Sequence, residues 1–304
     1  MTRQIRRFWI AFALVALAMG AFTLSSACGG DDDDDDSTEG DDDDDDDDGL
    51  PSGTGLSDGC DGGDGAAGSF DLTITSGGVE RRYLLDVPDS YDGSAMPLVL
   101  NLHGAGGSPD GHRTTTGFSE LGADEGFINV YPAALENDSG RTRWDTSDCN
   151  SADHHFIADT LNEVFAAYCV DLSAVFVSGF SNGASFTNEL VAGSTLFRAG
   201  APVGGTVNFG ENCGVTDAVS AIVIHGDADE TTPPENGVET AELFAAASEC
   251  GDPATNADGC EEYADCVEGE RVVFCSVPGM QHEWPEPDDR GSTAQIWEFF
   301  SSLM

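Results

Sequence analysis

The stretch Val175-Phe176-Val177-Ser178-Gly179-Phe180-Ser181-Asn182-Gly183 decides the fold of this chain. A short apolar run, typical of a buried strand, leads directly into a Gly-x-Ser-x-Gly pattern, and a segment able to form a helix follows. Gly179 and Gly183 let the backbone turn sharply and let the helix pack close to the strand. The Ser181 hydroxyl is therefore predicted to project from the end of the strand as a candidate nucleophile.

Strands and helices alternate on both sides of this motif. Helical spacing of apolar residues predicts helices over 156–168 and 296–300, and Asp153 near the start of the first favours the positive end of that helix. A hairpin is predicted over 70–87, and buried strands over 98–102, 127–131, 221–224 and 272–274. The alternation predicts an α/β fold, with a mostly parallel central sheet flanked by helices, in a single catalytic domain over 69–304.

A nucleophilic serine needs a base and an acid that orients the base, and this architecture supplies them in the chain order Ser, acid, His. After Ser181 only two histidines remain, His225 and His282. His225 precedes the candidate acids, which is the wrong order for a base, whereas His282 follows a strand. The candidate acids in the turn after residue 226 are Asp227, Asp229 and Glu230.

A second loop can stabilise negative charge on a reacting carbonyl oxygen. Leu102-His103-Gly104-Ala105-Gly106-Gly107 ends a buried strand and can present free backbone N–H groups. Hydrolases of this layout place half of the oxyanion hole in such a loop, and the other half is the N–H after the nucleophile, here that of Asn182. His103 is interpreted as a structural residue, because the contribution of the loop comes from backbone donors.

These residues resemble those of secreted polyhydroxybutyrate depolymerase-like and feruloyl esterase-like serine esterases, which are α/β-hydrolases. The similarity extends from about Gly77 to the C-terminus in separate blocks. The blocks are residues 82–91, 97–107, 126–132, 153–157, 169–171, 175–183, His225-Gly226-x-x-Asp229 with Pro233, and Gly279-x-x-His282 with Trp284-Pro285. The resemblance implies that Ser181 is the nucleophile, Asp229 the acid and His282 the base, with the N–H groups of Asn182 and Ala105 binding the oxyanion.

The chain departs from the family pattern at two positions near the site. Many depolymerase-like members carry Cys where Ala105 stands, and a small residue where Gln281 stands. Both departures concern the acyl pocket rather than the three catalytic positions. Phe180 and Trp284 flank two catalytic residues and are candidate contacts for an acyl or sugar group, with packing as the alternative for both.

The N-terminus predicts export. Arginines at 3, 6 and 7 precede an apolar run over 8–23, which is shorter than the roughly 20 residues that span a bilayer, so 1–27 reads as a signal peptide. Leu24-Ser25-Ser26-Ala27-Cys28 resembles the lipobox of bacterial lipoproteins, although Leu24 is one position further from the cysteine than in that family. We therefore expect a lipid on Cys28. The Asp runs 31–36 and 41–48 predict an extended tether over 28–68.

Nine cysteines are an odd number for an exported protein. Assigning Cys28 to a lipid leaves eight, which can close four disulfides whose pairing the sequence does not reveal. No two cysteines stand at Cys-x-x-Cys spacing, so a zinc site is not expected. The eight that remain are Cys60, Cys149, Cys169, Cys213, Cys250, Cys260, Cys266 and Cys275.

The charge excludes one broad class of function. A formal net charge of -46 argues against nucleic-acid binding, which depends on cations that neutralise phosphates. The prediction is an exported, surface-anchored monomer that hydrolyses feruloyl or acetyl esters of plant polysaccharide, or a polyhydroxyalkanoate polyester. No cofactor and no metal is expected, and the only membrane contact is through the lipid. A peptidase of the same fold and a non-catalytic surface adhesion module are the alternatives.

Overall fold

The computed structural model describes residues 51–137, 139–207, 209–215 and 217–304. They belong to one compact unit built around a 10-stranded sheet. The predicted signal peptide, Cys28 and the Asp runs lie outside the described residues, so the export signal, the lipid and the tether over these runs stay predictions.

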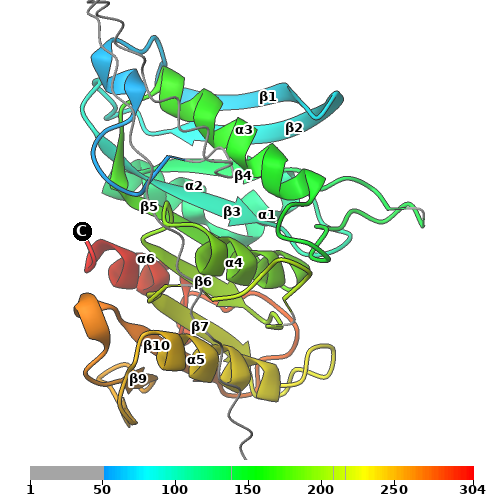
Figure 1. Cartoon of the computed structure of the whole chain (residues 1–304), viewed down its shortest axis with the longest axis vertical. Helices are drawn as coiled ribbons and strands as arrows, with labels where there is room; N and C mark the ends of the chain where they lie inside the picture. Colours follow the sequence, from blue (N-terminus) through cyan, green and yellow to red (C-terminus); the bar gives the residue numbers. More distant parts are fainter. Residues whose placement is uncertain (1–50, 138, 208, 216) are drawn as a thin grey trace, which may run out of the picture. The chain divides into compact units, whose positions relative to one another are not determined.

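The strands of the sheet follow the order β1-β2-β4-β3-β5-β6-β7-β10-β9-β8 (Figure 1). Neighbouring strands from β4 to β10 are parallel, and the pairs outside them are antiparallel. The predicted mostly parallel sheet is therefore confirmed. The strands are β1 (Gly68–Ser76), β2 (Val79–Val87), β3 (Met96–Leu102), β4 (Ile128–Pro132), β5 (Val170–Phe180), β6 (Ala199–Val203), β7 (Ala221–Gly226), β8 (Pro253–Thr255), β9 (Glu261–Tyr263) and β10 (Val272–Val277).

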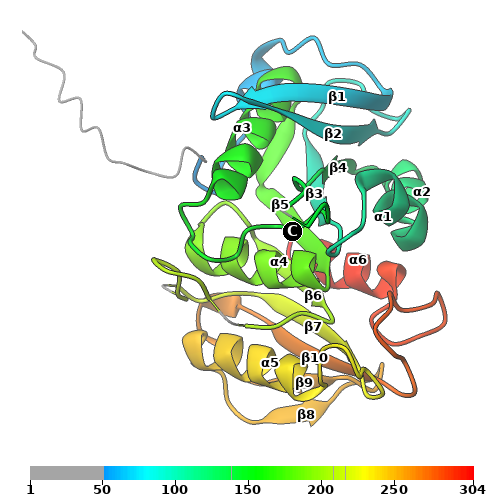
Figure 2. The ribbon, with the colours of Figure 1, turned by 90° about the vertical axis from the view of Figure 1, so that its right-hand side faces the viewer.

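Helices cover both faces of the sheet (Figures 1 and 2). On one face lie α3, α4 and α5, which contribute Phe156, Phe186 and Phe244 to a core cluster. On the other lie α1, α2 and α6, and α6 contributes Trp297 and Phe300 to a second cluster. The helices are α1 (Pro109–Thr116), α2 (Phe118–Glu125), α3 (Ala152–Ala167), α4 (Asn182–Gly193), α5 (Glu235–Ala247) and α6 (Thr293–Ser301).

The apolar runs of the sequence form strands because both faces of the sheet are buried. In β3, Leu98 and Leu100 belong to one core cluster and Val99 to the other, and all three are fully buried. Alternate side chains of a strand point to opposite faces, so a strand covered on both sides is apolar throughout. The parallel strands β5, β7 and β10 end at one edge of the sheet, so the loops after them lie together.

The folded domain begins earlier than the sequence predicted. The expected tether extended to residue 68, but residues 51–68 are packed against the start of β5. The Ser57 hydroxyl donates to the Tyr168 carbonyl at 2.7 Å and accepts from the Val170 N–H at 2.8 Å. Cys60 forms a disulfide with Cys169. The glycine-rich composition indicated a linker, but long-range contacts hold the segment on the domain.

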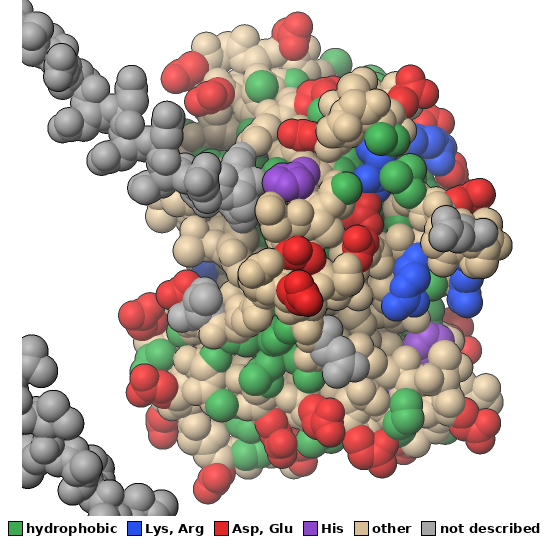
Figure 3. Space-filling model, turned by 45° about the vertical axis from the view of Figure 1, so that its right-hand side comes forward, with side chains coloured by type: hydrophobic (Ala, Val, Ile, Leu, Met, Phe, Trp, Pro, Cys, Tyr) green, Lys and Arg blue, Asp and Glu red, His purple; other side chains and the backbone are tan. Residues whose placement is uncertain are grey.

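All eight cysteines in the described part of the chain form disulfides, as expected from the cysteine count. The pairs are Cys60–Cys169, Cys149–Cys213, Cys250–Cys266 and Cys260–Cys275. Among the described residues, no helix is long and apolar enough to cross a membrane. Acidic side chains are spread over the face drawn in Figure 3, whereas the basic ones gather mostly towards one edge, beside a histidine.

Candidate active site

Ser181 lies in a sharp turn between β5 and α4. Its backbone has φ 55° and ψ -118°, a region that residues with a Cβ seldom adopt. A Cβ at Gly183 would lie 2.3 Å from the Leu102 carbonyl oxygen, so only glycine allows α4 to approach β3 so closely. The expected strand–turn–helix context is confirmed. The positive φ is at Ser181 itself, and Gly183 supplies room for the turn.

The structure brings Ser181, Asp229 and His282 together at the carboxyl edge of the sheet. The Ser181 Oγ lies 2.8 Å from His282 Nε2, and His282 Nδ1 lies 2.7 Å from Asp229 Oδ2. The three residues follow β5, β7 and β10 respectively. This is the geometry of a nucleophile, a base and an acid that orients the base.

The structure also separates the three candidate acids. Asp227 is exposed, and its Oδ1 accepts a hydrogen bond of 2.6 Å from the Gly279 N–H. No described contact joins Glu230 to His282. Asp229 is the carboxylate in contact with the imidazole, which agrees with the assignment from the resemblance.

Asp229 is held as a carboxylate by the loop around it. Its side chain is 1% exposed, and Oδ1 accepts hydrogen bonds of 2.8 Å from the N–H groups of Thr231 and Thr232. Burial raises the pKa of Asp229, but the hydrogen bonds from His282 and from the two N–H groups outweigh it, so the pKa lies below its ordinary value. Asp229 is therefore ionised near neutral pH and orients the His282 ring.

His225 and His103 lie close to the site but do not reach the Ser181 hydroxyl. His225 is buried, and its Nε2 lies 2.9 Å from the Thr232 carbonyl oxygen. His103 Nε2 accepts from the Ala134 N–H at 3.1 Å, and burial lowers the pKa of the ring. Both histidines hold loops in place, as expected for His103 and in agreement with the exclusion of His225 as the base.

The loop after β3 faces Ser181. A Cβ at Gly104 would lie 3.3 Å from the Cβ of Ser181, so the loop approaches the nucleophile directly. Among the described residues, neither the Ala105 N–H nor the Asn182 N–H donates to another backbone group. Both are therefore available to a ligand. Their assignment as oxyanion donors stays a prediction.

Trp144 contacts both segments that carry these two N–H groups, and the sequence analysis did not identify it. Its N–H donates to Asn182 Oδ1 at 2.8 Å, and its carbonyl accepts from Asn182 Nδ2 at 3.3 Å. Its indole N–H donates to the His103 carbonyl at 2.8 Å, and its ring stacks on Phe186 with 5.2 Å between centroids. The sequence shows only a single Trp within the polar stretch 141–148, and this pattern alone does not indicate a role for the residue.

The two candidate substrate contacts lie in different surroundings. The Phe180 ring is partly exposed, and its centroid lies 4.9 Å from that of His282. Trp284 is 7% exposed and packs edge-on against His112 and Phe118. Its indole N–H donates to Thr293 Oγ1 at 3.0 Å. Phe180 stays a candidate contact, whereas the neighbours of Trp284 favour the packing alternative.

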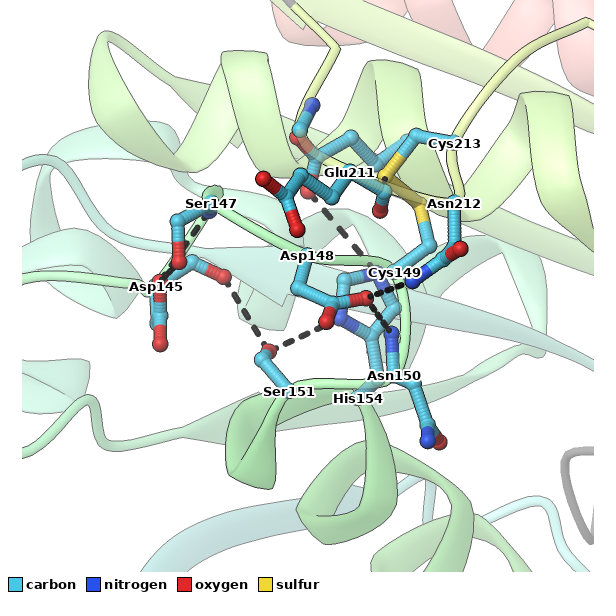
Figure 4. The surroundings of a disulfide bond; sticks show 12 residues. Asp145, Ser147, Asp148, Cys149, Asn150, Ser151, His154, Glu211, Asn212 and Cys213 are labelled. Carbon is cyan, nitrogen blue, oxygen red and sulfur yellow. Dashed lines mark hydrogen bonds and ion pairs between the residues drawn. A yellow bond between two sulfur atoms is a disulfide. The ribbon is translucent and has the colours of Figure 1, made fainter.

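A disulfide ties two loops of the chain together (Figure 4). Cys149 and Cys213 join the loop before α3 to the loop after β6. Cys149, His154 and Glu189 have ligand atoms within 4.8 Å of one another, but the Cys149 sulfur is committed to the disulfide. The two side chains that remain are too few for a zinc site of the usual kind.

Comparison with known proteins identifies relatives of this chain. No protein-family model matches the chain. It is 30% identical over 238 residues to feruloyl esterase C of Emericella nidulans, an alignment that covers 72% of this chain and 83% of that protein. It is 31% identical over 179 residues to a probable feruloyl esterase C of Aspergillus niger, but there the match spans 63% of the relative's length.

The solved structures support the same fold. The acetyl xylan esterase from Aspergillus awamori superposes with a TM-score of 0.61 and 19% identity, over 77% of this chain and 99% of that one. A putative dipeptidyl aminopeptidase IV from Bacteroides ovatus also superposes, with a TM-score of 0.57 at 15% identity, over 78% of this chain and 36% of that one. At these identities the likeness concerns the fold alone. The sequence relatives decide the family, and the chain belongs to the feruloyl esterase-like family of α/β-hydrolase serine esterases.

Proposed function

We propose that this chain is an extracellular hydrolase of carboxylic esters on plant polysaccharide, either feruloyl or acetyl, and that it acts through an acyl-enzyme on Ser181. The observation that carries the proposal is the hydrogen-bond chain from Ser181 through His282 to the ionised Asp229. The relatives named as feruloyl esterases, and a bifunctional acetylxylan esterase/xylanase of Neocallimastix patriciarum that is 24% identical over 67% of this chain, support the substrate class.

The reaction follows from the positions of these atoms. His282 Nε2 takes the proton of the Ser181 hydroxyl as Oγ attacks the ester carbonyl carbon. The N–H groups of Asn182 and Ala105 stabilise the negative oxygen, and the alcohol leaves with the proton from His282. Water then attacks the acyl-enzyme with His282 as base and releases the carboxylic acid. The chain's own side chains supply every proton transfer, so the proposal needs no metal or organic cofactor.

The proposed location is outside the cell. Four disulfides in the described residues fit an oxidising compartment. A signal peptide over 1–27 and a lipid on Cys28 belong to the same proposal and rest on the sequence. Mass analysis of the mature N-terminus distinguishes a diacylated Cys28 from simple cleavage.

The substrate class is tested by a panel. The purified protein is incubated with methyl ferulate, acetylated xylan, a polyhydroxybutyrate film and a set of chromogenic peptides. We expect turnover of methyl ferulate, of acetylated xylan or of both, and none of the peptides. Turnover of the film alone would move the assignment to a polyester hydrolase, and peptide cleavage without ester cleavage would overturn the proposal.

The mechanism is tested with a covalent probe. An alkyl fluorophosphonate should label Ser181 in the wild-type protein, and peptide mapping should locate the label there. Ser181→Ala should lose the label and nearly all ester hydrolysis, typically by several orders of magnitude. Ser301→Ala, at the exposed end of α6, is the matched control and should keep both. Labelling of another serine would refute the assignment.

A further inference from the structure

Five of the eight arginines in the described residues are paired with carboxylates. Arg81, Arg82, Arg113, Arg198 and Arg271 each have a carboxylate oxygen within 2.8 Å. This is expected in a chain with 57 acidic residues and 11 arginines. Among the described residues, Arg141, Arg143 and Arg290 form no ion pair. Two of these three lie in one short segment, which is therefore unusual for this protein.

That segment lies against the loop that faces the nucleophile. Arg141 Nη2 donates to the Ala105 carbonyl at 2.9 Å, and a Cβ at Gly106 would lie 2.9 Å from Arg141 Nε. The neighbouring Thr142 carbonyl accepts from the Gly106 N–H at 2.7 Å, and the Thr142 hydroxyl donates to the Gly107 carbonyl at 2.7 Å. Three contacts thus fix the segment on the loop beside Ser181.

Arg143 lies two residues further along the same extended segment. Side chains two apart in an extended chain point to the same side, so Arg141 and Arg143 face the same way. Arg143 lines a cavity of about 490 Å³ next to Trp144, whose backbone holds the Asn182 side chain. Both arginine side chains are exposed and keep donors that no described carboxylate occupies.

The carboxylates near Arg143 are mostly engaged elsewhere. Asp153, also in the cavity wall, is paired with Arg81 at 2.7 Å. Asp145 Oδ1 accepts from the N–H and the hydroxyl of Ser147. Glu136 lines the cavity as well, without an ion pair among the described contacts. The Arg143 guanidinium is therefore the part of this wall with free capacity for an anion.

We propose that Arg141 and Arg143 form a subsite for a carboxylate on the saccharide part of the substrate, so that the enzyme favours esters of acidic sugars such as uronic acids. This inference rests on the proposed function and names its substrate class more closely. A guanidinium binds a carboxylate through paired N–H donors, which gives two parallel hydrogen bonds to its two oxygens.

The acidic surface does not cancel this subsite. At physiological ionic strength charges are screened over about 8 Å, so the carboxylates of the remote surface act weakly at the cleft. A substrate carboxylate within hydrogen-bond distance of a guanidinium feels mainly that partner.

The test uses a matched pair of substrates. One is the feruloyl ester of methyl glucuronoside, and the other is the same ester with the sugar carboxylate replaced by a carboxamide. The quantity measured is the ratio of kcat/KM for the charged ester to that for the neutral ester, at about 0.15 M salt. We expect the wild-type ratio to exceed 1 and to fall as salt rises.

Variants assign the preference to the arginines. Arg143→Gln should lower the ratio about two- to fivefold, the range for an exposed ion pair, and Arg143→Lys should restore part of it. Arg141→Gln should lower the ratio too, together with turnover of the neutral ester, because it also loses the bond to Ala105. Arg290→Gln, an unpaired arginine that lies elsewhere, is the control and should leave the ratio unchanged.

The outcomes separate the two proposals. If wild-type protein hydrolyses neither ester, the proposed function fails. If it hydrolyses both, but the ratio is 1 or does not change in Arg143→Gln, the subsite is refuted while the esterase stands. The carboxylate can be placed on the acyl group instead, as in a hemi-ester of glutaric acid, and Arg143→Gln should then change kcat/KM less than it does for the sugar carboxylate. A larger change with the acyl carboxylate would mean that the arginine binds the acyl side, and would refute the proposal.

Discussion

At the scale of single residues, the choice between two neighbouring acids can be measured. Asp229→Asn should lower kcat/KM for an ester by about 10² to 10⁴, because the amide cannot hold the His282 ring in the tautomer that accepts the serine proton. Asp227→Asn removes a carboxylate that binds the Gly279 N–H and should cost less than about tenfold. The measurement is steady-state hydrolysis by both variants, with circular dichroism as the check on folding. The reverse order of losses would assign the role to Asp227.

Trp144 is a positioning residue, and its substitution tests the oxyanion hole. Trp144→Phe keeps a ring to stack on Phe186 but removes the indole N–H that binds the His103 carbonyl. The loop that carries Ala105 then loses one anchor, so stabilisation of the developing oxyanion should weaken more than ground-state binding does. We expect kcat to fall about tenfold with a smaller change in KM.

The control for that variant is Trp297→Phe, which lies in the core on the opposite face of the sheet. It should lower stability without this selective loss of kcat. If Trp144→Phe changed KM and left kcat intact, Trp144 would act on substrate binding, and its role in holding the loop would be disproved.

At the scale of elements, the sequence predicted the strands whose burial shows in their composition. The runs in β3, β4, β5, β7 and β10 are rich in Val, Ile, Leu and Phe, and all were predicted. The strand β6, Ala199-Gly200-Ala201-Pro202-Val203, was not, although it lies in the centre of the sheet between β5 and β7. A Cβ at Gly200 would lie 2.6 Å from Val191 Cγ2 of α4, so the contact with this helix requires small residues, which carry no strand signal.

The residues of the site also fall into those that the sequence predicted and those that it did not. Ser181 and His282 follow strands at places that the motif and the chain order mark, so the sequence was enough to name them as candidates. The chain order left Asp227, Asp229 and Glu230 open, and the choice of Asp229 came from the resemblance to the family. Trp144 and the paired loops around Cys149 and Cys213 depend on contacts between segments far apart in the chain. Such contacts leave no periodic pattern, and only the folded structure brings them together.

The contact between α3 and α4 is expected to depend on pH. Glu189 on α4 is buried, and burial raises its pKa to about 7, with His154 of α3 at 3.8 Å. Because the pKa of Glu189 in the folded protein lies above its ordinary value of 4.5, the folded state holds this proton more tightly. The proton on Glu189 therefore contributes stability that is lost as the pH rises from about 4.5 to 7, and this loss is complete above about 7. The neighbouring His154, whose pKa burial lowers to about 4, titrates with the opposite sign, so a variant of Glu189 is needed to isolate its contribution.

The variant Glu189→Gln has no such titration. We expect its free energy of unfolding, relative to wild type, to improve by about 1 to 3 kcal/mol between pH 5 and pH 8. Thermal unfolding at a series of pH values measures the difference. Glu163→Gln, on the neighbouring helix and bonded to the Tyr83 hydroxyl, is the matched control. A difference that does not change with pH would mean that Glu189 is ionised in the folded protein throughout.

At the scale of the whole molecule, the charge and the disulfides act together. The residues after position 48 hold 42 acidic and 8 basic side chains, and such an excess of like charge opposes the compact state. Four disulfides restrict the unfolded chain and so offset this repulsion. Added salt should therefore stabilise the protein, which scanning unfolding at low and high ionic strength can show.

The disulfide between Cys60 and Cys169 should contribute more to stability than the disulfide between Cys250 and Cys266. It closes a sequence separation of 109 residues, against 16 for Cys250–Cys266. In the chain-entropy account a longer closed loop stabilises more, here by about 1 to 2 kcal/mol. Replacing both Cys60 and Cys169 by Ala should cost about 2 to 5 kcal/mol and lower the Tm more than the same change at Cys250 and Cys266.

Activity separates this loss of stability from damage to the site. Cys169 precedes β5, whereas Ser181 follows the other end of the same 11-residue strand. The variant without the Cys60–Cys169 bridge should therefore keep its kcat at temperatures well below its Tm. A wild-type Tm in that variant would mean that residues 51–68 add nothing to the fold and serve as the tether that their composition predicts. A lower kcat in the folded variant would mean that the start of β5 is coupled to the nucleophile at its far end.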